Sequence, residues 1–206
     1  MGVLASVATL AVVVYAVSYG SPGNDDDVDQ RFYGYFLRDA KAMEEMGLPV
    51  YWLGRQFTAG GLIFQGPYAA EFGGEVEGGI FIHYTSWLDG TPGEGRNVGL
   101  EITVYGRDAW ELAKDRILNP RLMSNEGEVT RQTVIVKGRR AELMSVPSAN
   151  RPVNALSLIL DLDSVVVVAV APSGGQRPGG GDYNPFINNP DLLVQVIDEN
   201  LRPYPE

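Results

Sequence analysis

The stretch QTVIVKGRRAELMSVPSANRPVNALSLILDLDSVVVVAVA, residues 132–171, determines the fold of this chain. It holds four runs rich in β-branched and apolar residues, at 132–136, 141–146, 155–160 and 165–171. Two short polar connections, 137–140 and 161–164, join the runs in pairs. Short polar connections between strands are typical of hairpins, and hairpins pair their strands antiparallel. The stretch therefore predicts the centre of an antiparallel sheet.

Upstream of this stretch the sequence predicts more strands. They are expected over 50–53, 62–64, 79–87 and 98–105. In the last of these, apolar residues at 98, 100, 102 and 104 alternate with Gly99, Glu101, Thr103 and Tyr105. Such alternation is typical of a half-buried strand.

Helical spacing of apolar residues predicts three helices. The first covers 28–46 and ends at Gly47, and the second covers 108–118 and stops before Pro120. The third covers 191–201, with Asn189 as its cap and Pro190 at its first position. Helices beside an antiparallel sheet predict an α+β fold, with a two-layer domain of sheet and packed helices.

The N-terminal run VLASVATLAVVVYAVSY, residues 3–19, is uncharged and apolar all round, unlike the helix of a protein surface. Its length lies between those of a cleaved signal and a membrane-spanning helix. We favour an uncleaved anchor; a signal cleaved before Tyr19 and a buried core helix remain open. The expected division is a membrane anchor or signal at 1–20, an acidic linker at 21–27 and an extracytoplasmic domain at 28–206. The expected location is the cell membrane, single-pass with the C-terminal domain outside, or else secretion.

Composition, charge and residue spacing argue against several kinds of partner, covalent link and metal site. The chain carries a formal net charge of −10, and no basic patch is interleaved with aromatic residues, so nucleic acid is not an expected partner. Cysteine is absent, so neither a disulfide nor the lipid-bearing thiol of a bacterial lipoprotein is available. The acidic cluster at 25–29 does not fit a calcium loop, because Gln30 replaces the turn glycine and Phe36 the bidentate glutamate. We expect no metal and no cofactor.

Two segments carry a partial resemblance to known proteins. The first is Pro49-Val50-Tyr51-Trp52-Leu53-Gly54, and the second is Asn184-Pro185-Phe186 followed by the helix at 189–201. The first resembles a segment of uncharacterised, membrane-anchored or lipoprotein-like extracytoplasmic proteins of actinobacteria and neighbouring phyla. The second is similar in layout to extracytoplasmic domains of bacterial lipoproteins and anti-sigma-like proteins. The resemblance implies location and fold, and it implies no activity.

His83 is the only histidine, and it lies mid-strand on the same face as Phe81 and Thr85. No Gly-x-Ser-x-Gly elbow accompanies it, so a structural or surface role is expected. Large aromatic and arginine side chains next to Gly- and Pro-rich turns are the expected partner- or ligand-binding residues, because binding surfaces use such side chains. They are Trp52, Arg55, Trp87, Arg177, Tyr183 and Phe186.

The sequence thus predicts a membrane-tethered extracytoplasmic domain with a non-catalytic binding or envelope-support role. Its partners would be the membrane, through the N-terminal helix, and an envelope protein or a small ligand. The alternative is a hydrolase or transferase whose site is assembled from Asp and Glu side chains and His83.

Overall fold

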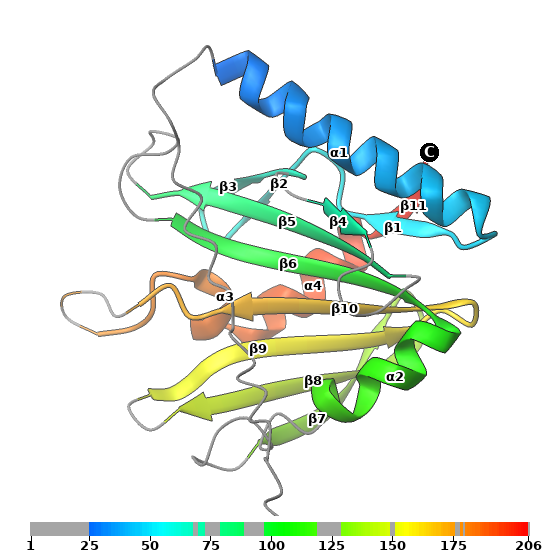
Figure 1. Ribbon diagram of the computed structural model, residues 1–206. Coiled ribbons are helices and arrows are strands. Elements are labelled where there is room, and N and C mark those ends of the chain that lie inside the picture. Colours follow the sequence, from blue (N-terminus) through cyan, green and yellow to red (C-terminus); the bar gives the residue numbers. More distant parts are fainter. Residues whose placement is uncertain are drawn as a thin grey trace, which may run out of the picture.

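The computed structural model describes residues 25–67, 70–72, 79–88, 97–118, 129–148, 151–175, 178 and 180–205. Among these residues, nine strands form one sheet in which every pairing is antiparallel, in the order β2-β3-β5-β6-β10-β9-β8-β7, with β4 also paired to β5 (Figure 1). The α+β class and the antiparallel sheet predicted from the sequence are confirmed.

The sheet strands are β2 (Gln56–Ala59), β3 (Leu62–Gln65), β4 (Ala70–Phe72), β5 (Gly79–Trp87), β6 (Asn97–Gly106), β7 (Thr130–Val136), β8 (Arg139–Ser148), β9 (Arg151–Asp161) and β10 (Val165–Pro172). A separate two-stranded ribbon pairs β1 (Val50–Trp52) with β11 (Arg202–Tyr204). The helices are α1 (Asp25–Glu45), α2 (Arg107–Leu118), α3 (Pro185–Asn188) and α4 (Pro190–Asn200).

Alternation along β10 assigns the two faces of the sheet. Val165 and Val167 point into the main core, which also contains Phe186 of α3 and Leu193 of α4. Val166 and Val168 point to the other face, where they pack with Trp110 of α2 in a smaller core. We call these the main-core face and the α2 face. Figure 1 shows α2 in front of the strands and α3 and α4 behind them.

Helices on both faces correct the expectation of a two-layer domain. The amphipathic pattern of α2 says that one side of this helix is buried, but it does not say against which face of the sheet. The assignment depends on how the chain leaves β6, because α2 begins at Arg107 directly after Gly106.

The long helix α1 runs along the edge of the fold beside the β1–β11 ribbon (Figure 1). Phe36, Ala40 and Met43, at helical spacing, are buried, but Met46 near the end of the predicted helix is 53% exposed. Gly47, at φ 72°, adopts the left-handed conformation that commonly ends a helix.

The hairpin between β7 and β8 turns tightly through Lys137 and Gly138. Both residues have positive φ, 52° and 71°, which is the geometry of a two-residue type I′ turn. The N–H of Lys137 donates to Oδ1 of Asp198 on α4 at 2.5 Å. The hairpin predicted from the sequence is confirmed, and α4 holds its turn in place.

The start of the chain needs one correction. α1 begins at Asp25, inside the segment 21–27 that the sequence assigns to a linker. The predicted anchor or signal at 1–20 lies outside the described residues. Within the described residues, no helix combines the length and apolar character that a membrane span needs.

Candidate functional site

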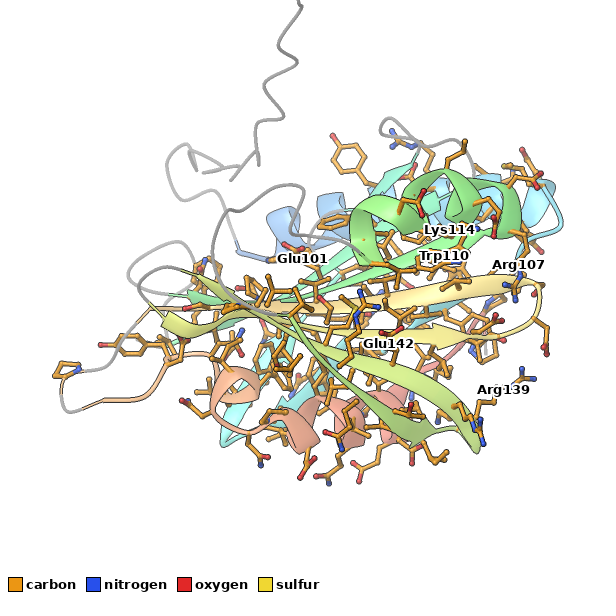
Figure 2. All side chains as sticks on the ribbon, turned by 90° about the horizontal axis from the view of Figure 1, so that it is seen from below. Glu101, Arg107, Trp110, Lys114, Arg139 and Glu142 are labelled. Atoms are coloured by element: carbon orange, nitrogen blue, oxygen red, sulfur yellow. The ribbon has the colours of Figure 1, made fainter. Side chains whose placement is uncertain are left out.

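A cavity of about 360 Å³ opens on the α2 face between α2 and strands β7 to β10. Its apolar wall is formed by Trp110, Ile159 and Val166, and its polar wall includes Arg131, Thr133, Arg140, Glu142 and Asp161. We call it the α2 pocket. Figure 2 shows Trp110 on α2 and Glu142 on β8 from below the fold.

Trp110 forms the apolar wall because α2 turns one side to the sheet. Its side chain is only 9% exposed and packs with Ile159 and Val166. The ring of Tyr105 at the end of β6 lies beside it, with 6.0 Å between ring centroids. Leu112, two residues along the helix, points away and is 79% exposed. The indole is therefore held by packing and forms a fixed surface.

The polar wall is assembled by strand register. Thr133 of β7 lies opposite Glu142 of β8, and Glu142 lies opposite Ile159 of β9. Because side chains of directly paired residues project to the same face, these three side chains form one row across the α2 face. Arg131 and Arg140 lie on the same face, on opposite sides of this row, because Arg131 pairs with Met144 and Arg140 pairs with Ile135.

Most charged side chains of the pocket are held in place by ion pairs. Arg131 Nη1 donates to Glu142 Oε1 at 2.9 Å, and Arg131 also donates to the carbonyl of Leu118. Asp161 accepts two hydrogen bonds from Arg107, and these lower the pKa of Asp161. Within the described part of the chain, the side chain of Arg140 has no hydrogen bond and no ion pair. Its guanidinium is the cation of this wall that is open to a ligand.

These charges suit the orientation of a ligand better than proton transfer. A carboxylate that arginine holds ionised accepts hydrogen bonds, and it does not deliver a proton near neutral pH. Asp161 is such a carboxylate. The described residues also contain no group of three His, Asp or Glu side chains that could hold a metal ion.

His83 lies opposite Glu101 on β5 and β6, on the α2 face but outside the lining of the α2 pocket. Its Nδ1 is 4.0 Å from Glu101 Oε1, and the two side chains are 31% and 34% exposed. A Cβ at Gly99 would come within 2.8 Å of His83 Cε1, so glycine there leaves room for the imidazole. Burial lowers the pKa of His83 and raises the pKa of Glu101, so the surroundings favour the neutral form of each.

Lowering the pH from about 7.5 to about 5.5 is expected to destabilise the wild-type protein relative to His83→Gln. An unfolded histidine has a pKa near 6.5, and the folded pKa of His83 is lower, so the unfolded state binds the proton more readily below 6.5. Stability is therefore lost as the pH falls from 6.5 toward the folded pKa. The measurement is the difference in Tm between the two proteins at both pH values.

For Glu101→Gln, the stability difference from the wild type is expected to change with pH in the opposite direction. The folded pKa of Glu101 lies above its usual 4.5, so the wild-type protein loses stability relative to this variant as the pH rises from 4.5 toward the folded pKa. A Tm difference that stays constant with pH for both variants would contradict the two assignments.

The binding residues predicted from the sequence occupy different parts of the fold. Trp52 and Phe186 are buried, at 6% and 0% exposure. Trp52 stacks on Phe36 at 5.4 Å, whereas Phe186 packs against Phe64 at 5.3 Å. Both side chains belong to the main core, and burial at these two positions favours a packing role.

The other predicted binding residues are less buried. Trp87 and Tyr183 are half-buried, and Arg177 lies outside the described residues. Arg55 is exposed and places its guanidinium carbon 3.9 Å from the ring centroid of Tyr33. These two residues line a second, smaller cavity of about 210 Å³. A binding role for these positions stays a prediction.

Sequence reasoning missed the α2 pocket. In the sequence, Trp110 is one apolar position of the predicted helix at 108–118, and the charged residues of β7 and β8 resemble an ordinary solvated strand face. The available signal was the run from Thr130 to Arg140, which holds four basic residues and no acidic residue in a chain of net charge −10. That local reversal of charge marks the region.

A polar cluster located where β6 begins and β10 ends was also not predicted from the sequence. The buried carboxylate of Asp182 accepts hydrogen bonds from the N–H groups of Gly174 and Asn184 and from the hydroxyl of Ser173. The buried Asn184 donates through Nδ2 to the carbonyls of Gly99 and Pro172, at 2.9 and 2.8 Å. Its Oδ1 accepts from the N–H of Phe186 and caps α3. The cluster joins the ends of β6 and β10 to α3.

The fold and the pocket together define an α+β domain with an antiparallel sheet and a cavity that combines an aromatic wall with charged groups. No protein-family model matches the chain, and neither the curated proteins nor the solved structures that were searched contain a match.

Proposed function

We propose that this domain is a non-catalytic binding module whose α2 pocket takes a ligand with an apolar body and an anionic group. The observation that carries the proposal is the exposed Arg140, whose side chain has no ion pair among the described residues, in the same pocket as the fixed indole of Trp110. Ligand pockets commonly combine an apolar lining with a few placed polar groups. The volume of about 360 Å³ is of the size that small-molecule sites have.

Each part of the ligand has a counterpart in the pocket. An aromatic or branched apolar body would pack against Trp110, Ile159 and Val166. A carboxylate or phosphate would accept two parallel hydrogen bonds from the planar guanidinium of Arg140. Glu142 is already paired with Arg131, so the ion pair limits repulsion between this carboxylate and the ligand anion.

We also propose, from the sequence, that residues 1–20 tether this module to the outer side of a cell membrane. The apolar run at 3–19 supports this proposal. The partner would then be an envelope protein or a small ligand outside the cytoplasm. Recovery of the full chain in the soluble fraction after cell lysis would contradict the tether.

The pocket is tested with 2-naphthoate, which joins an apolar body to a carboxylate, and with 2-naphthylmethylamine, which carries the opposite charge. We expect 2-naphthoate to shift the NMR signal of the Trp110 indole N–H, and Arg140→Ala to weaken its binding about tenfold, the loss of one charge-assisted contact of about 1.4 kcal/mol. Equal binding of the amine, or no shift at Trp110, would contradict the proposal.

Lys41→Ala is the matched control for the loss of a positive charge. Lys41 is exposed on α1, where it lies 3.8 Å from Glu45. It does not line the α2 pocket. We expect this variant to bind 2-naphthoate as the wild type does.

The alternative of a hydrolase or transferase would place the chemistry at His83 and Glu101. The lowered pKa of His83 keeps the imidazole neutral near pH 7, as a general base requires. The two sites can be separated by experiment, because His83 does not line the α2 pocket. His83→Gln should abolish an activity of the alternative kind and should leave the binding of 2-naphthoate intact.

A further inference from the structure

The strand β7 ends the sheet next to the α2 pocket. It pairs with β8 on one side, and among the described residues no strand pairs with its other side. Arg131 and Thr133 are exposed, and Ile135 is 60% exposed. An exposed edge strand offers a row of backbone donors and acceptors to another extended chain.

The turn fixes which backbone groups face outward. In a two-residue hairpin the residues that flank the turn, here Val136 and Arg139, form a hydrogen-bonded pair. Hydrogen-bonded and non-hydrogen-bonded pairs alternate along an antiparallel ladder. Arg131, Thr133 and Ile135 therefore occupy the non-hydrogen-bonded positions, and their N–H and C=O groups point to the open edge.

The same three residues place their side chains on the α2 face. Arg131 and Thr133 line the α2 pocket, and Ile135 lies opposite Arg140. A strand added to this edge would thus lengthen the sheet and would also extend the wall of the pocket. Its side chains on this face would lie beside Arg131, Thr133 and Ile135.

Charge selects the kind of strand. The segment 130–140 contains four basic residues and no acidic residue. Arg131 and Arg139 pair with Glu142 and Asp163, whereas the side chains of Lys137 and Arg140 have no ion pair within the described residues. Two copies of this edge would bring together two such lysines and two such arginines, so an acidic chain fits it better than a second copy.

We infer that β7 binds an extended, acidic peptide segment of a partner protein as a further strand of the sheet, with an apolar side chain of that segment beside Ile135 and carboxylates near Arg131 and Arg140. This inference rests on the proposed function, since it names the class of ligand that the α2 pocket takes. Backbone hydrogen bonds supply affinity in this mode of recognition, and side chains supply specificity.

The opposite edge strand of the sheet, β2, provides a matched comparison for β7. The strand β2 also ends the sheet, and its hairpin to β3 turns through Gly60 and Gly61, both at positive φ. Thr58 occupies a non-hydrogen-bonded, outward-facing position of β2, as Thr133 does in β7. The segment 56–65 has no charged residue, so this edge lacks the basic side chains that select an acidic strand.

The test uses the full chain and the fluorescent peptide acetyl-Thr-Glu-Thr-Val-Thr-Glu-Thr-amide, followed by fluorescence anisotropy. On one face this peptide carries two glutamates and a valine. Thr133→Pro is expected to weaken its binding at least tenfold, because proline removes an outward N–H and blocks the edge. The fold should tolerate the change, since that N–H is not bonded to β8. Thr58→Pro should leave the binding unchanged.

Charge dependence is tested with the same peptide carrying lysine in place of each glutamate. We expect it to bind about tenfold more weakly, because two attractive contacts become repulsive. Equal binding of the two peptides would overturn the inference.

Hydrogen exchange of the wild-type protein gives a test that does not depend on any variant folding. Saturating acidic peptide is expected to slow the exchange of the amides of Arg131, Thr133 and Ile135 at least tenfold, and to leave Gln132 and Val134 nearly unchanged. Protection that does not alternate, or protection at Thr58 instead, would overturn the inference.

Failure of the inference can be separated from failure of the proposed function. If 2-naphthoate shifts the Trp110 signal but the peptide protects no amide of β7, the pocket stands and the strand addition is wrong. If the peptide protects alternate amides while 2-naphthoate does not bind, the strand addition stands and the small-ligand chemistry of the pocket is wrong. The inference is overturned if the peptide binds Thr133→Pro as tightly as it binds the wild type. It is also overturned if added anionic vesicles bind the protein and displace the peptide while the amides of β7 stay unprotected from hydrogen exchange.

Discussion

Asn184→Leu is expected to lower the free energy of unfolding by about 3–5 kcal/mol. Asn184 is fully buried, and its side chain makes three hydrogen bonds. Leucine would leave the carbonyls of Gly99 and Pro172 without this donor and would remove the cap of α3. Each buried polar group left without a partner costs about 1–3 kcal/mol, and a lost cap costs about 1 kcal/mol. Guanidinium unfolding of the two proteins measures the difference.

Asn189→Ala is the control, because the sequence predicted Asn189 as a helix cap. It does precede α4, but its side chain makes no capping hydrogen bond, so its loss should change stability by less than about 0.5 kcal/mol. The assignment would be wrong if the two substitutions destabilised the protein equally.

The contrast between Asn184 and Asn189 illustrates the limit of local patterns. Asn-Pro occurs at both positions, and the sequence marks each equally well as the start of a helix. What separates them is a contact between Asn184 and Gly99, which lie 85 positions apart in the chain. A contact of that range depends on the tertiary fold, and neighbouring residues do not reveal it.

The strands were predictable where the chain alternates, as in β6, or carries a long run of apolar and β-branched residues, as in β5 and the four strands of 130–172. Among the short strands, β1 and β3 were predicted from apolar runs, whereas β2, β4 and β11, each of four residues or fewer, were not. A two-residue period cannot be recognised in three or four residues. Of these, β11 also depends on pairing with β1, which lies at the opposite end of the described chain.

The α2 pocket could not be predicted from the sequence for a related reason. Arg131, Glu142 and Asp161 come from three different strands, and each looks like a solvated position of its own strand. The register of β7, β8 and β9 places them on one face, and the position of α2 encloses that face. Alternation can assign a side chain to a face, but it does not tell which strands are neighbours.

Trp52→Ala is expected to lower the free energy of unfolding by about 3–5 kcal/mol, since it removes a large side chain from the main core. The indole stacks on Phe36 and meets the edge of Tyr204, with ring centroids 5.4 and 5.1 Å away. These contacts link α1 to the β1–β11 ribbon, so the loss should loosen both. Chemical unfolding provides the measurement.

Trp52→Phe and Arg55→Ala complete the test. The indole N–H of Trp52 is buried and has no hydrogen-bond partner among the described residues. Phenylalanine removes this unfavourable group while it keeps most of the ring, so the cost should stay below about 1.5 kcal/mol. Arg55 is exposed above Tyr33, and its loss should cost about 1 kcal/mol or less.

A binding hot spot behaves differently from a core residue. Its replacement weakens the capture of a partner and leaves the fold stable. If Trp52→Ala unfolded at the same denaturant concentration as wild type, Trp52 would be free to serve the binding role that the sequence predicts. If Trp52→Ala instead loses much stability and Trp52→Phe loses little, Trp52 is a packing residue. In that case stability depends on the volume of the ring and does not depend on the indole N–H, as expected for a core position.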